Sequence, residues 1–309
     1  MANAPKEIVV ISGKGGTGKT SLVGSFAALA RGAVLADCDV DAADLHLLLA
    51  PDVKETHDFV GGKIASIVSD KCIGCGRCKE LCNFGALALN GPANDVVQKT
   101  YAVDPIACEG CGVCVRFCPV EAMEFNDAVN GQWFLSETRF GPMVHAKLGA
   151  AEENSGKLVS LIRKQARQLA GQRGLPLIIV DGSPGIGCPV IASISGADLV
   201  LVVTEPTLSG QHDLERVADL AAHFGAPAMV CVNKWDINPE IAGRIEEKAH
   251  RRGLQTAGRI AYDASVTQAQ VAEKSIVEYC DEPLRKQIAS VWETAVAALE
   301  TATDTRRST

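Results

Sequence analysis

The sequence predicts an α/β fold built on a parallel β-sheet and interrupted by a small cysteine-rich α+β domain. Apolar, β-branched segments alternate with amphipathic segments before and after a central region. Strands that alternate with helices form parallel sheets covered on both faces. The central region differs, because eight of the twelve cysteines fall between Cys72 and Cys118. We therefore expect residues 1–55 and 136–309 to form one discontinuous domain and residues 56–135 to form an inserted one.

Composition restricts the class of protein. The 309-residue chain has a net charge of −7 and 47% hydrophobic residues, which is typical of a globular protein and disfavours a nucleic-acid partner. No apolar run approaches the ~20 residues that span a bilayer, and the N-terminus lacks a signal-peptide core. The expected C-terminal helix lacks the basic and bulky apolar faces of a membrane anchor. We expect a cytoplasmic protein, in which cysteines serve metal or redox chemistry.

The first segment of the chain predicts a strand, a loop, a helix, a strand and a short helix. "EIVVIS" predicts a strand buried on both faces, and "TSLVGSFAALARG" predicts a helix that ends at Gly32. "AVLADCD" predicts the second strand. "AADLHLLLAP" predicts a short helix that stops before Pro51.

The last segment resumes this alternation. Further strands are expected in "LPLIIVDGSPG", "ADLVLVVTEP", "PAMVCVNKWD" and "LQTAGRIAYD". Helices are expected in "GKLVSLIRKQARQLAGQRG", "GQHDLERVADLAAHFG", "PEIAGRIEEKAHRRG" and from Pro283 past Leu299. Both segments therefore supply strands to one sheet.

The loop after the first strand, "GKGGTGKT", satisfies the phosphate-binding pattern G-x-x-x-x-G-K-[ST]. Its glycines let backbone N–H groups curve around phosphate oxygens at a helix N-terminus. Lys19 is expected to reach the β- and γ-phosphates, and the Thr20 hydroxyl is expected to bind Mg²⁺. The residues expected to hold ATP in this loop are Gly13, Lys14, Gly15, Gly16, Thr17, Gly18, Lys19, Thr20 and Ser21.

"KGGTGKT" resembles the deviant phosphate loop of the MinD/ParA, Mrp and nitrogenase iron-protein group. The resemblance implies a P-loop NTPase fold, ATP hydrolysis that depends on Lys14 and Lys19, and an ATP-dependent homodimer. In that group the first lysine, here Lys14, reaches the nucleotide of the partner subunit. The alternative for Lys14 is a solvated loop lysine.

Three further stretches resemble the same group. "DCDVDAAD" and "IIVDGSPGIG" match its two switch segments, and "VCVNKWD" matches its base-recognition segment. The resemblance implies that Asp39 orients or activates the attacking water, with Asp37 beside the metal. It also implies that Asp181 holds Mg²⁺ through water and that Asn233 recognises adenine. Taken singly, each aspartate could instead be a strand-end cap or a turn residue.

Two cysteine runs, beginning at Cys72 and Cys108, share the spacing C-x₂-C-x₂-C-x₃-C. This is the pattern of bacterial two-cluster ferredoxins, in which the fourth cysteine of each run ligates the other cluster. One [4Fe–4S] cluster is expected on Cys72, Cys75, Cys78 and Cys118, and the other on Cys82, Cys108, Cys111 and Cys114. Zinc sites pair C-x₂₋₄-C units and fit this spacing poorly. Asn83 departs from the pattern, which has a proline there, as at Pro119.

Cys188 lies seven residues after Asp181. The nitrogenase iron protein has a cluster-ligating cysteine at the same spacing, so the resemblance implies a metal or a cluster held between subunits. The alternative is a small apolar residue at the start of a helix.

The whole chain resembles MinD-superfamily ATPases with an inserted ferredoxin domain, which are often labelled cobyrinic acid a,c-diamide synthase-like. The resemblance implies an ATP-hydrolysing homodimer that gates electron transfer to a metalloenzyme or redox partner, or the maturation of one. Two other functions remain open. One is an iron–sulfur cluster carrier of the Mrp type, and the other is a non-redox MinD/ParA-like switch with structural clusters.

Overall fold

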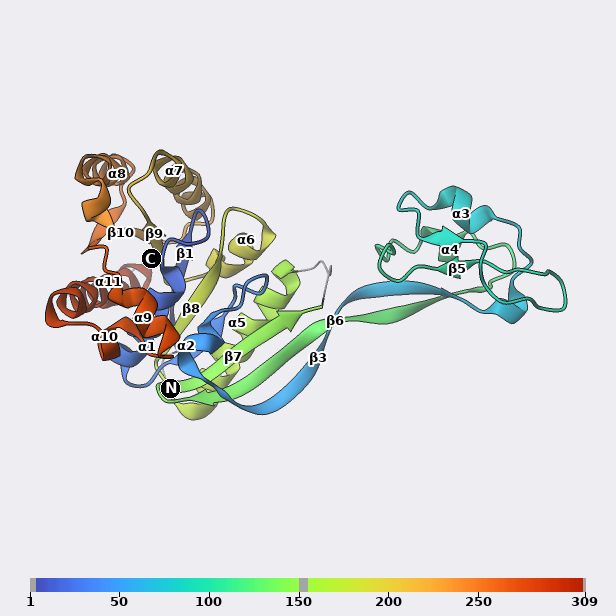
Figure 1. Cartoon of the computed structure of the whole chain (residues 1–309), viewed down its shortest axis with the longest axis horizontal. Coiled ribbons are helices and arrows are strands. Elements are labelled where there is room, and N and C mark those ends of the chain that lie inside the picture. Colours follow the sequence, from blue (N-terminus) through green and yellow to red (C-terminus); the bar gives the residue numbers. More distant parts are fainter. Residues whose placement is uncertain (1–3, 150–154, 308–309) are drawn as a thin grey trace. The chain divides into compact units, whose positions relative to one another are not determined.

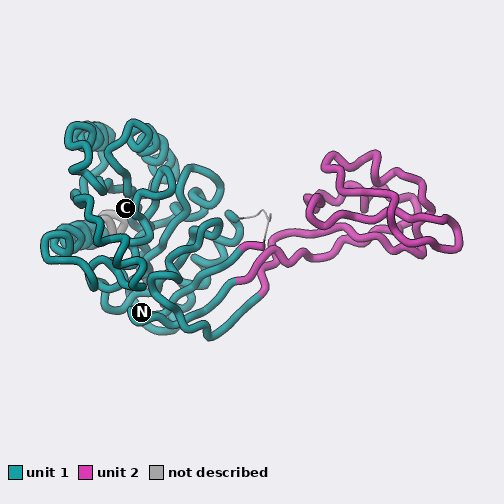
Figure 2. The backbone as a smooth tube through the Cα atoms, viewed as in Figure 1, with its two compact units in different colours: residues 1–57, 133–147, 155–309 teal, residues 58–132, 148–154 magenta. Residues whose placement is uncertain are grey.

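The computed structural model describes residues 4–149 and 155–307 (Figure 1), and these divide into two compact units (Figure 2). The larger unit holds the described residues up to His57, those of Trp133–Lys147 and those from Ser155 onward. The smaller unit holds Asp58–Gln132 with Leu148 and Gly149. The expected domain limits, 55/56 and 135/136, differ from these by two and three residues. That each unit is an independent domain stays a prediction, and the outermost residues, 1–3 and 308–309, lie outside the described ranges.

One sheet runs through the larger unit, with the strand order β11-β10-β9-β1-β8-β2-β7-β6-β3 among the described residues. Its strands that the sequence predicted are β1 (Lys6–Ser12), β2 (Val34–Asp37), β8 (Leu177–Pro184), β9 (Leu199–Thr204), β10 (Ala228–Asn233) and β11 (Gln255–Ile260). Each of them pairs in parallel with its neighbours. The predicted parallel α/β sheet is therefore confirmed, and its carboxyl ends meet at one edge.

Helices cover both faces of this sheet. Those that the sequence predicted are α1 (Lys19–Ala30), α2 (Leu45–Leu49), α5 (Ser155–Arg173), α7 (Leu208–His223), α8 (Pro239–Arg251) and α11 (Glu282–Arg307). The sequence did not predict α9 (Ser265–Val271) and α10 (Ile276–Tyr279), and it indicated a helix start at Cys188, where α6 (Cys188–Ile194) begins, only as an alternative. Helices of about two turns or fewer carry little periodicity. Phe26 of α1 packs on Trp292 of α11 with ring centroids 5.0 Å apart. Within the described ranges, no helix is long and apolar enough to cross a membrane.

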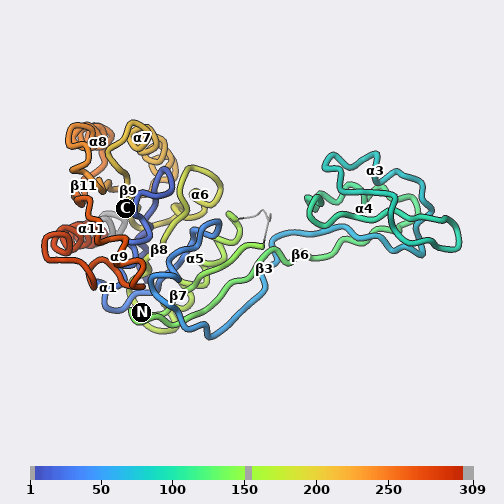
Figure 3. The backbone as a smooth tube through the Cα atoms, in the orientation of Figure 1, coloured from blue at the N-terminus to red at the C-terminus, as the bar shows by residue number. Residues whose placement is uncertain are grey.

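Three strands at one edge of the sheet were not predicted: β3 (Asp52–Ile67), β6 (Met123–Thr138) and β7 (Gly141–Leu148). β7 pairs in parallel with β2, while the two-residue turn from β6 to β7 reverses the chain. β3 and β6 lie side by side (Figure 3). Most of β3 is exposed or only partly buried, and its three buried residues are Phe59, Gly61 and Ala65, so it carries little of the apolar alternation that identifies a strand.

The smaller unit consists of short elements joined by loops. Its described helices and strands, apart from β3 and β6, are α3 (Arg77–Leu81), β4 (Leu87–Ala88), β5 (Ala102–Val103) and α4 (Val113–Arg116). β4 and β5 pair antiparallel. Gly76 and Gly112 precede α3 and α4 with φ of +78° and +73°, a conformation that favours glycine. The internal repeat of the sequence thus becomes two similar loop–helix turns.

Candidate functional site

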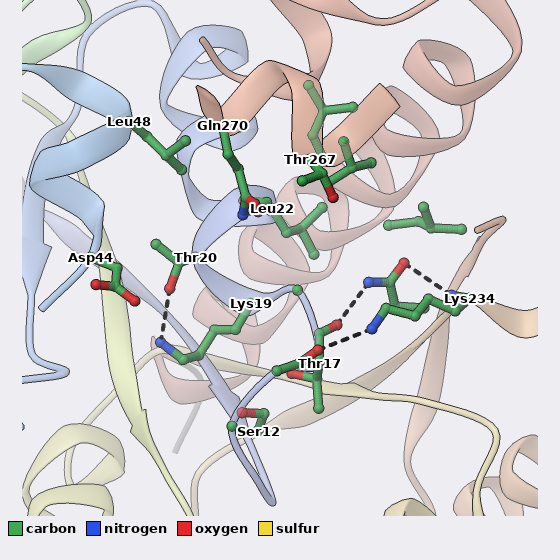
Figure 4. Close-up of a pocket in the computed structure, with 18 of the residues that line it drawn as sticks. Ser12, Thr17, Lys19, Thr20, Leu22, Asp44, Leu48, Lys234, Thr267 and Gln270 are labelled. Carbon is green, nitrogen blue, oxygen red and sulfur yellow. Dashed lines mark hydrogen bonds between the residues drawn. The ribbon is translucent and has the colours of Figure 1, made fainter. Parts of the chain in front are cut away.

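The carboxyl edge of the sheet brings the predicted nucleotide residues together. Asp181 of β8 is in register with Val10 of β1 and with Asp37 of β2, so both neighbouring strands end beside the phosphate loop. A cavity of about 580 Å³ opens there (Figure 4), a size typical of small-molecule sites. Its lining includes the predicted residues Gly15, Gly16, Thr17, Gly18, Lys19, Thr20, Ser21, Asp39 and Asn233.

Lys19 lies at the inner end of this cavity among carboxylates. Its Nζ is 2.5 Å from Asp181 Oδ1, 3.2 Å from Asp39 Oδ2 and 3.5 Å from Thr20 Oγ1. Burial lowers the pKa of Lys19, but the charges of Asp181 and Asp39, together with Asp37, outweigh burial and hold the pKa above its ordinary value. Lys19 therefore stays cationic and can neutralise phosphate charge.

Asp37 holds the first switch segment in place. This fully buried carboxylate accepts hydrogen bonds from the backbone N–H of Asp39 at 3.2 Å and of Leu45 at 3.3 Å. Burial and the nearby charge of Asp181 raise the pKa of Asp37 well above its usual value. Burial also raises the pKa of Asp39, although the ammonium of Lys19 opposes the shift.

Two buried side-chain oxygens in the described chain have no hydrogen-bond partner: Thr17 Oγ1 and Asp181 Oδ2. Asp181 is 0% exposed, and leaving such a group unsatisfied is costly. Asp181 Oδ1 and the Thr20 hydroxyl lie 2.5 and 3.5 Å from the same atom, Lys19 Nζ. A carboxylate and a hydroxyl suit Mg²⁺, which takes one or two protein oxygens and keeps several waters. The residues present therefore fit a magnesium ion at this point.

Lys14 is not among the residues that line this cavity, and its side chain is bound within its own chain. Its Nζ lies 2.6 Å from Glu205 Oε1 and 3.2 Å from Ser209 Oγ. Glu205 also receives Lys234 Nζ at 3.3 Å, and that ammonium donates to the carbonyl of Gly16 at 3.0 Å. No sequence motif predicted a role for Glu205 or Lys234. The available signals were their positions directly after the last residues of β9 and β10.

Asn233 lines the cavity and is already engaged by the phosphate loop. Its Nδ2 donates to the carbonyl of Thr17 at 2.7 Å, and its Oδ1 accepts the N–H of Lys234 at 3.0 Å. A Cβ atom at Gly18 would lie only 2.4 Å from Asn233 Nδ2, so this position requires glycine. A similar limit applies at Gly13, where a Cβ would lie 2.2 Å from the Cβ of Asp213. That Asn233 recognises adenine stays a prediction.

The eight clustered cysteines line two separate cavities in the smaller unit. One cavity is lined by Cys72, Cys75, Cys78 and Cys118, and the other by Cys82, Cys108, Cys111 and Cys114. Each set takes three cysteines from one run and the fourth from the other. Apolar side chains complete each lining, including Ile67, Met123, Phe84 and Val103.

The chemistry of these two sets suits iron–sulfur clusters. Burial raises the pKa of the Cys78 thiol to about 11 and also raises that of Cys114, and iron would favour the deprotonated form. The backbone N–H of Ala122 points at Cys118 Sγ from 3.3 Å, as a cluster ligand requires. Across the described ranges, no three His, Cys, Asp or Glu side chains are grouped to hold a single metal ion; a four-iron cluster separates its ligands more widely.

The remaining cysteines differ in exposure. Cys188 is the first residue of α6 and is exposed, so its position also fits the alternative of a residue at the start of a helix. Its role as a ligand stays a prediction. Cys38 and Cys231 are fully buried in the larger unit, and Cys280 is 2% exposed.

Known proteins resemble this chain both in its cysteine-rich region and over most of its length. A family model described as a 4Fe–4S dicluster domain matches residues 71–122. The uncharacterized protein MJ0578 of Methanocaldococcus jannaschii is 35% identical over 235 residues, which cover 75% of this chain and 79% of that protein.

Solved structures share the fold of the chain. MinD in the MinC:MinD cell division complex of Aquifex aeolicus is similar with a TM-score of 0.56 and 17% identity, over 94% of this chain and 96% of that one. The cell division ATPase MinD of Pyrococcus furiosus is similar with a TM-score of 0.55 and 15% identity, over 95% and 98%. At these identities the likeness concerns the fold.

Proposed function

Because this chain belongs to the family of MJ0578 and joins a MinD/ParA-type P-loop fold to a 4Fe–4S dicluster domain, we propose that it is an ATP-hydrolysing homodimeric iron–sulfur protein. Its nucleotide state gates electron transfer to, or maturation of, a partner metalloenzyme in the cytoplasm. The observation that carries the proposal is the connection between the two sites. Asp39 at the nucleotide cavity precedes α2, and β3 begins three residues after the end of α2.

The phosphate loop supplies the binding of ATP. Backbone N–H groups from Gly13 to Ser21 surround the phosphates, and Lys19 neutralises them. The Thr20 hydroxyl and the buried Asp181 carboxylate would hold Mg²⁺, which would stabilise charge on the phosphates. Asp37 fixes the segment that carries Asp39.

Asp39 performs the step at the attacking water. Its carboxylate is 7% exposed and lies 3.2 Å from Lys19 Nζ, so its position is fixed by a charged hydrogen bond. Burial raises its pKa, which brings the carboxylate closer to the basicity that a general base needs near neutral pH. Asp39 thus orients the water and can accept its proton.

The two cysteine sets supply the redox centres. Each set offers four thiols inside an apolar cavity, and the clusters they hold would exchange single electrons. Exposed Cys188 favours a second candidate function, a cluster carrier of the Mrp type, because a transient cluster needs an accessible ligand. A switch with purely structural clusters is the third candidate.

Redox titration in defined nucleotide states separates these functions. The cluster potentials of the full-length, iron-loaded protein are measured by electron paramagnetic resonance with Mg·ATP, with Mg·ADP and without nucleotide. We expect the potentials to depend on nucleotide in the wild type and to lose this dependence in Lys19→Gln. Lys164→Gln, which removes an exposed lysine of α5, is the matched control. Potentials that ignore nucleotide in every sample would leave the structural switch as the better function.

A turnover assay tests the ATPase itself. Lys14→Ala and Lys19→Ala should each reduce ATP hydrolysis about 100-fold or more while leaving the iron content unchanged, since removal of a group that stabilises transition-state charge has this scale of effect. Equal rates in wild type and Lys14→Ala would exclude the dimer part of the proposal. Affinity capture from anaerobic cells with Asp39→Asn held in ATP would identify the partner.

A further inference from the structure

Arg139 occupies the turn between β6 and β7. The turn is braced by Thr138, whose hydroxyl donates to the carbonyl of Gly141 at 2.7 Å and accepts the N–H of Phe140 at 3.2 Å. The guanidinium of Arg139 stacks over the Phe140 ring at 4.7 Å. The side chain therefore leaves the turn in a defined direction.

The guanidinium binds three other elements at once. Its Nη2 donates to the carbonyl of Leu48 in α2 at 2.9 Å and to that of Glu273, just after α9, at 3.0 Å. Nε donates to Glu278 Oε1 in α10 at 3.1 Å, and Nη2, whose two hydrogens are shared among three acceptors, lies 2.9 Å from Glu278 Oε2. The same carboxylate accepts the N–H and the hydroxyl of Ser275 at 2.8 Å, which caps α10. One side chain thus joins α2 to the α9–α10 segment.

These elements are walls of the nucleotide cavity. Leu48, Gln270 and Ile276 line it from α2, α9 and α10, and Figure 4 shows Leu48 and Gln270 on the side away from Lys19. The α9–α10 wall is tied to the helix of the phosphate loop. Gln270 Nε2 donates to Ser21 Oγ at 2.8 Å, and the N–H of Ile276 donates to Ser25 Oγ at 3.2 Å.

The strands that lead into and out of the cysteine-rich unit begin and end next to the residues that Arg139 joins. β3 begins at Asp52, three residues after α2 ends at Leu49. β6 ends at Thr138, the residue before Arg139. The guanidinium therefore contacts the element before β3 and sits at the end of β6, while it also holds both walls of the nucleotide cavity.

We propose that Arg139 is the positioning residue that transmits nucleotide occupancy of the cavity to the paired strands β3 and β6. Nucleotide that contacts α2 and α9–α10 changes their separation, and only a side chain that binds both walls responds to that change. The planar guanidinium group of arginine suits this role, because it donates several hydrogen bonds in fixed directions. The proposal rests on the proposed function, because it requires nucleotide to bind in this cavity.

Hydrogen–deuterium exchange of the full-length, iron-loaded protein tests the proposal. Exchange is compared without nucleotide, with Mg·ADP and with a non-hydrolysable ATP analogue. In the wild type, nucleotide should slow exchange in peptides that cover 45–67 and 123–148. In Arg139→Gln this response should be lost, while nucleotide affinity falls by no more than about tenfold, since one set of charged hydrogen bonds to the walls is removed. Arg139→Lys should recover part of the response.

Arg173→Gln is the matched control. Arg173 forms an ion pair with Glu137 of β6, and neither residue of this pair belongs to the walls of the cavity. Its loss should leave the response intact, and Glu278→Gln should weaken the response as Arg139→Gln does. A full response in Arg139→Gln, or none in a wild type that binds nucleotide, would overturn the inference and leave the proposed function standing. A wild type that binds no nucleotide would overturn both.

Discussion

Lys14 and Glu205 form an ion pair between the phosphate loop and the end of β9, with Lys14 Nζ 2.6 Å from Glu205 Oε1. Glu205 also binds Lys234. Burial raises the pKa of Glu205, but the hydrogen bonds and charges of the two lysines outweigh burial and lower it, so the carboxylate is ionised near neutral pH. In this arrangement Lys14 is held within its own chain. Any contact of Lys14 with a partner's nucleotide must first break this pair.

Glu205→Gln should therefore strengthen ATP-dependent self-association. A glutamine keeps the size of the side chain but not the charge that holds Lys14. Partly exposed ion pairs contribute about 0.2–1 kcal/mol each, and a homodimer releases two of them, so the dimer affinity should rise about two- to thirtyfold. Sedimentation velocity with Mg·ATP, in an Asp39→Asn background that slows hydrolysis, measures the change.

Glu215→Gln serves as the control for Glu205→Gln. Glu215 lies on α7 and pairs with Lys248 at 2.5 Å, so the substitution removes a comparable charge without releasing Lys14. It should leave self-association unchanged. Weaker association in Glu205→Gln than in wild type would show that Glu205 supports the dimer and does not restrain Lys14.

The crossed cysteine sets predict which cysteines act together. Cys118→Ala should cost about half of the bound iron, because it removes one ligand from the cavity that holds Cys72. Adding Cys72→Ala should then cost little more iron, whereas adding Cys108→Ala should remove the rest. Iron per chain and electron paramagnetic resonance measure both effects.

A fully buried cysteine outside these sets gives the control. Cys231→Ala changes a thiol in β10 and should leave the iron content intact. If the iron that remains in Cys118→Ala instead disappears on Cys72→Ala, the ligand sets follow the two runs and are not crossed.

Local patterns made much of the fold and of the site predictable. "EIVVIS", followed by glycines and a helix, defines its strand and loop within a few residues. Each cysteine run likewise places its four cysteines within eleven residues. The contacts of Lys14 with Glu205 and of Arg139 with Glu278 join residues more than 130 positions apart. Local sequence patterns do not predict contacts between residues so far apart. β3 was not recognised for a different reason, since most of its side chains are exposed or only partly buried and it carries little apolar alternation.

The backbone next to the second cysteine set tolerates no side chain at Gly110. It has a φ of +60°, and an added Cβ would lie 2.0 Å from the backbone oxygen of Lys63. Gly110→Ala should destabilise the iron-loaded protein by about 2 kcal/mol or more, since it adds a clash to left-handed strain. Iron retention during a thermal ramp measures the effect.

Gly85→Ala isolates the strain from the clash. Gly85 has a φ of +68° but no atom within 4 Å of the added Cβ, so the cost should stay near 1 kcal/mol. Equal iron retention in Gly110→Ala and Gly85→Ala would mean that the strand β3 moves away easily from this loop.

His145 makes the stability of the larger unit depend on pH. It is 9% exposed, lies 2.9 Å from Ser136 Oγ through Nε2, and stacks on Phe134 at 4.9 Å. Burial, with a smaller effect of the charge of His46, lowers the pKa of His145 to about 4. Because the folded state holds this pKa below the ordinary value near 6.5, the unfolded chain binds more protons as the pH falls. The stabilisation by neutral His145 is therefore complete above about pH 6.5 and is lost progressively toward pH 4.

The stability lost through His145 between pH 7.5 and pH 5 should be about 2 kcal/mol, which follows from the shift in pKa. Urea unfolding followed by tryptophan fluorescence measures the free energy of unfolding over this range. The range stops at pH 5 so that the iron–sulfur clusters stay bound. His145→Gln should remove this part of the pH dependence at some cost in stability at neutral pH. His250→Gln, which changes an exposed histidine of α8, should follow the wild-type curve. If wild type and His145→Gln lose stability in parallel as the pH falls, His145 is protonated as readily in the folded protein as in the unfolded chain.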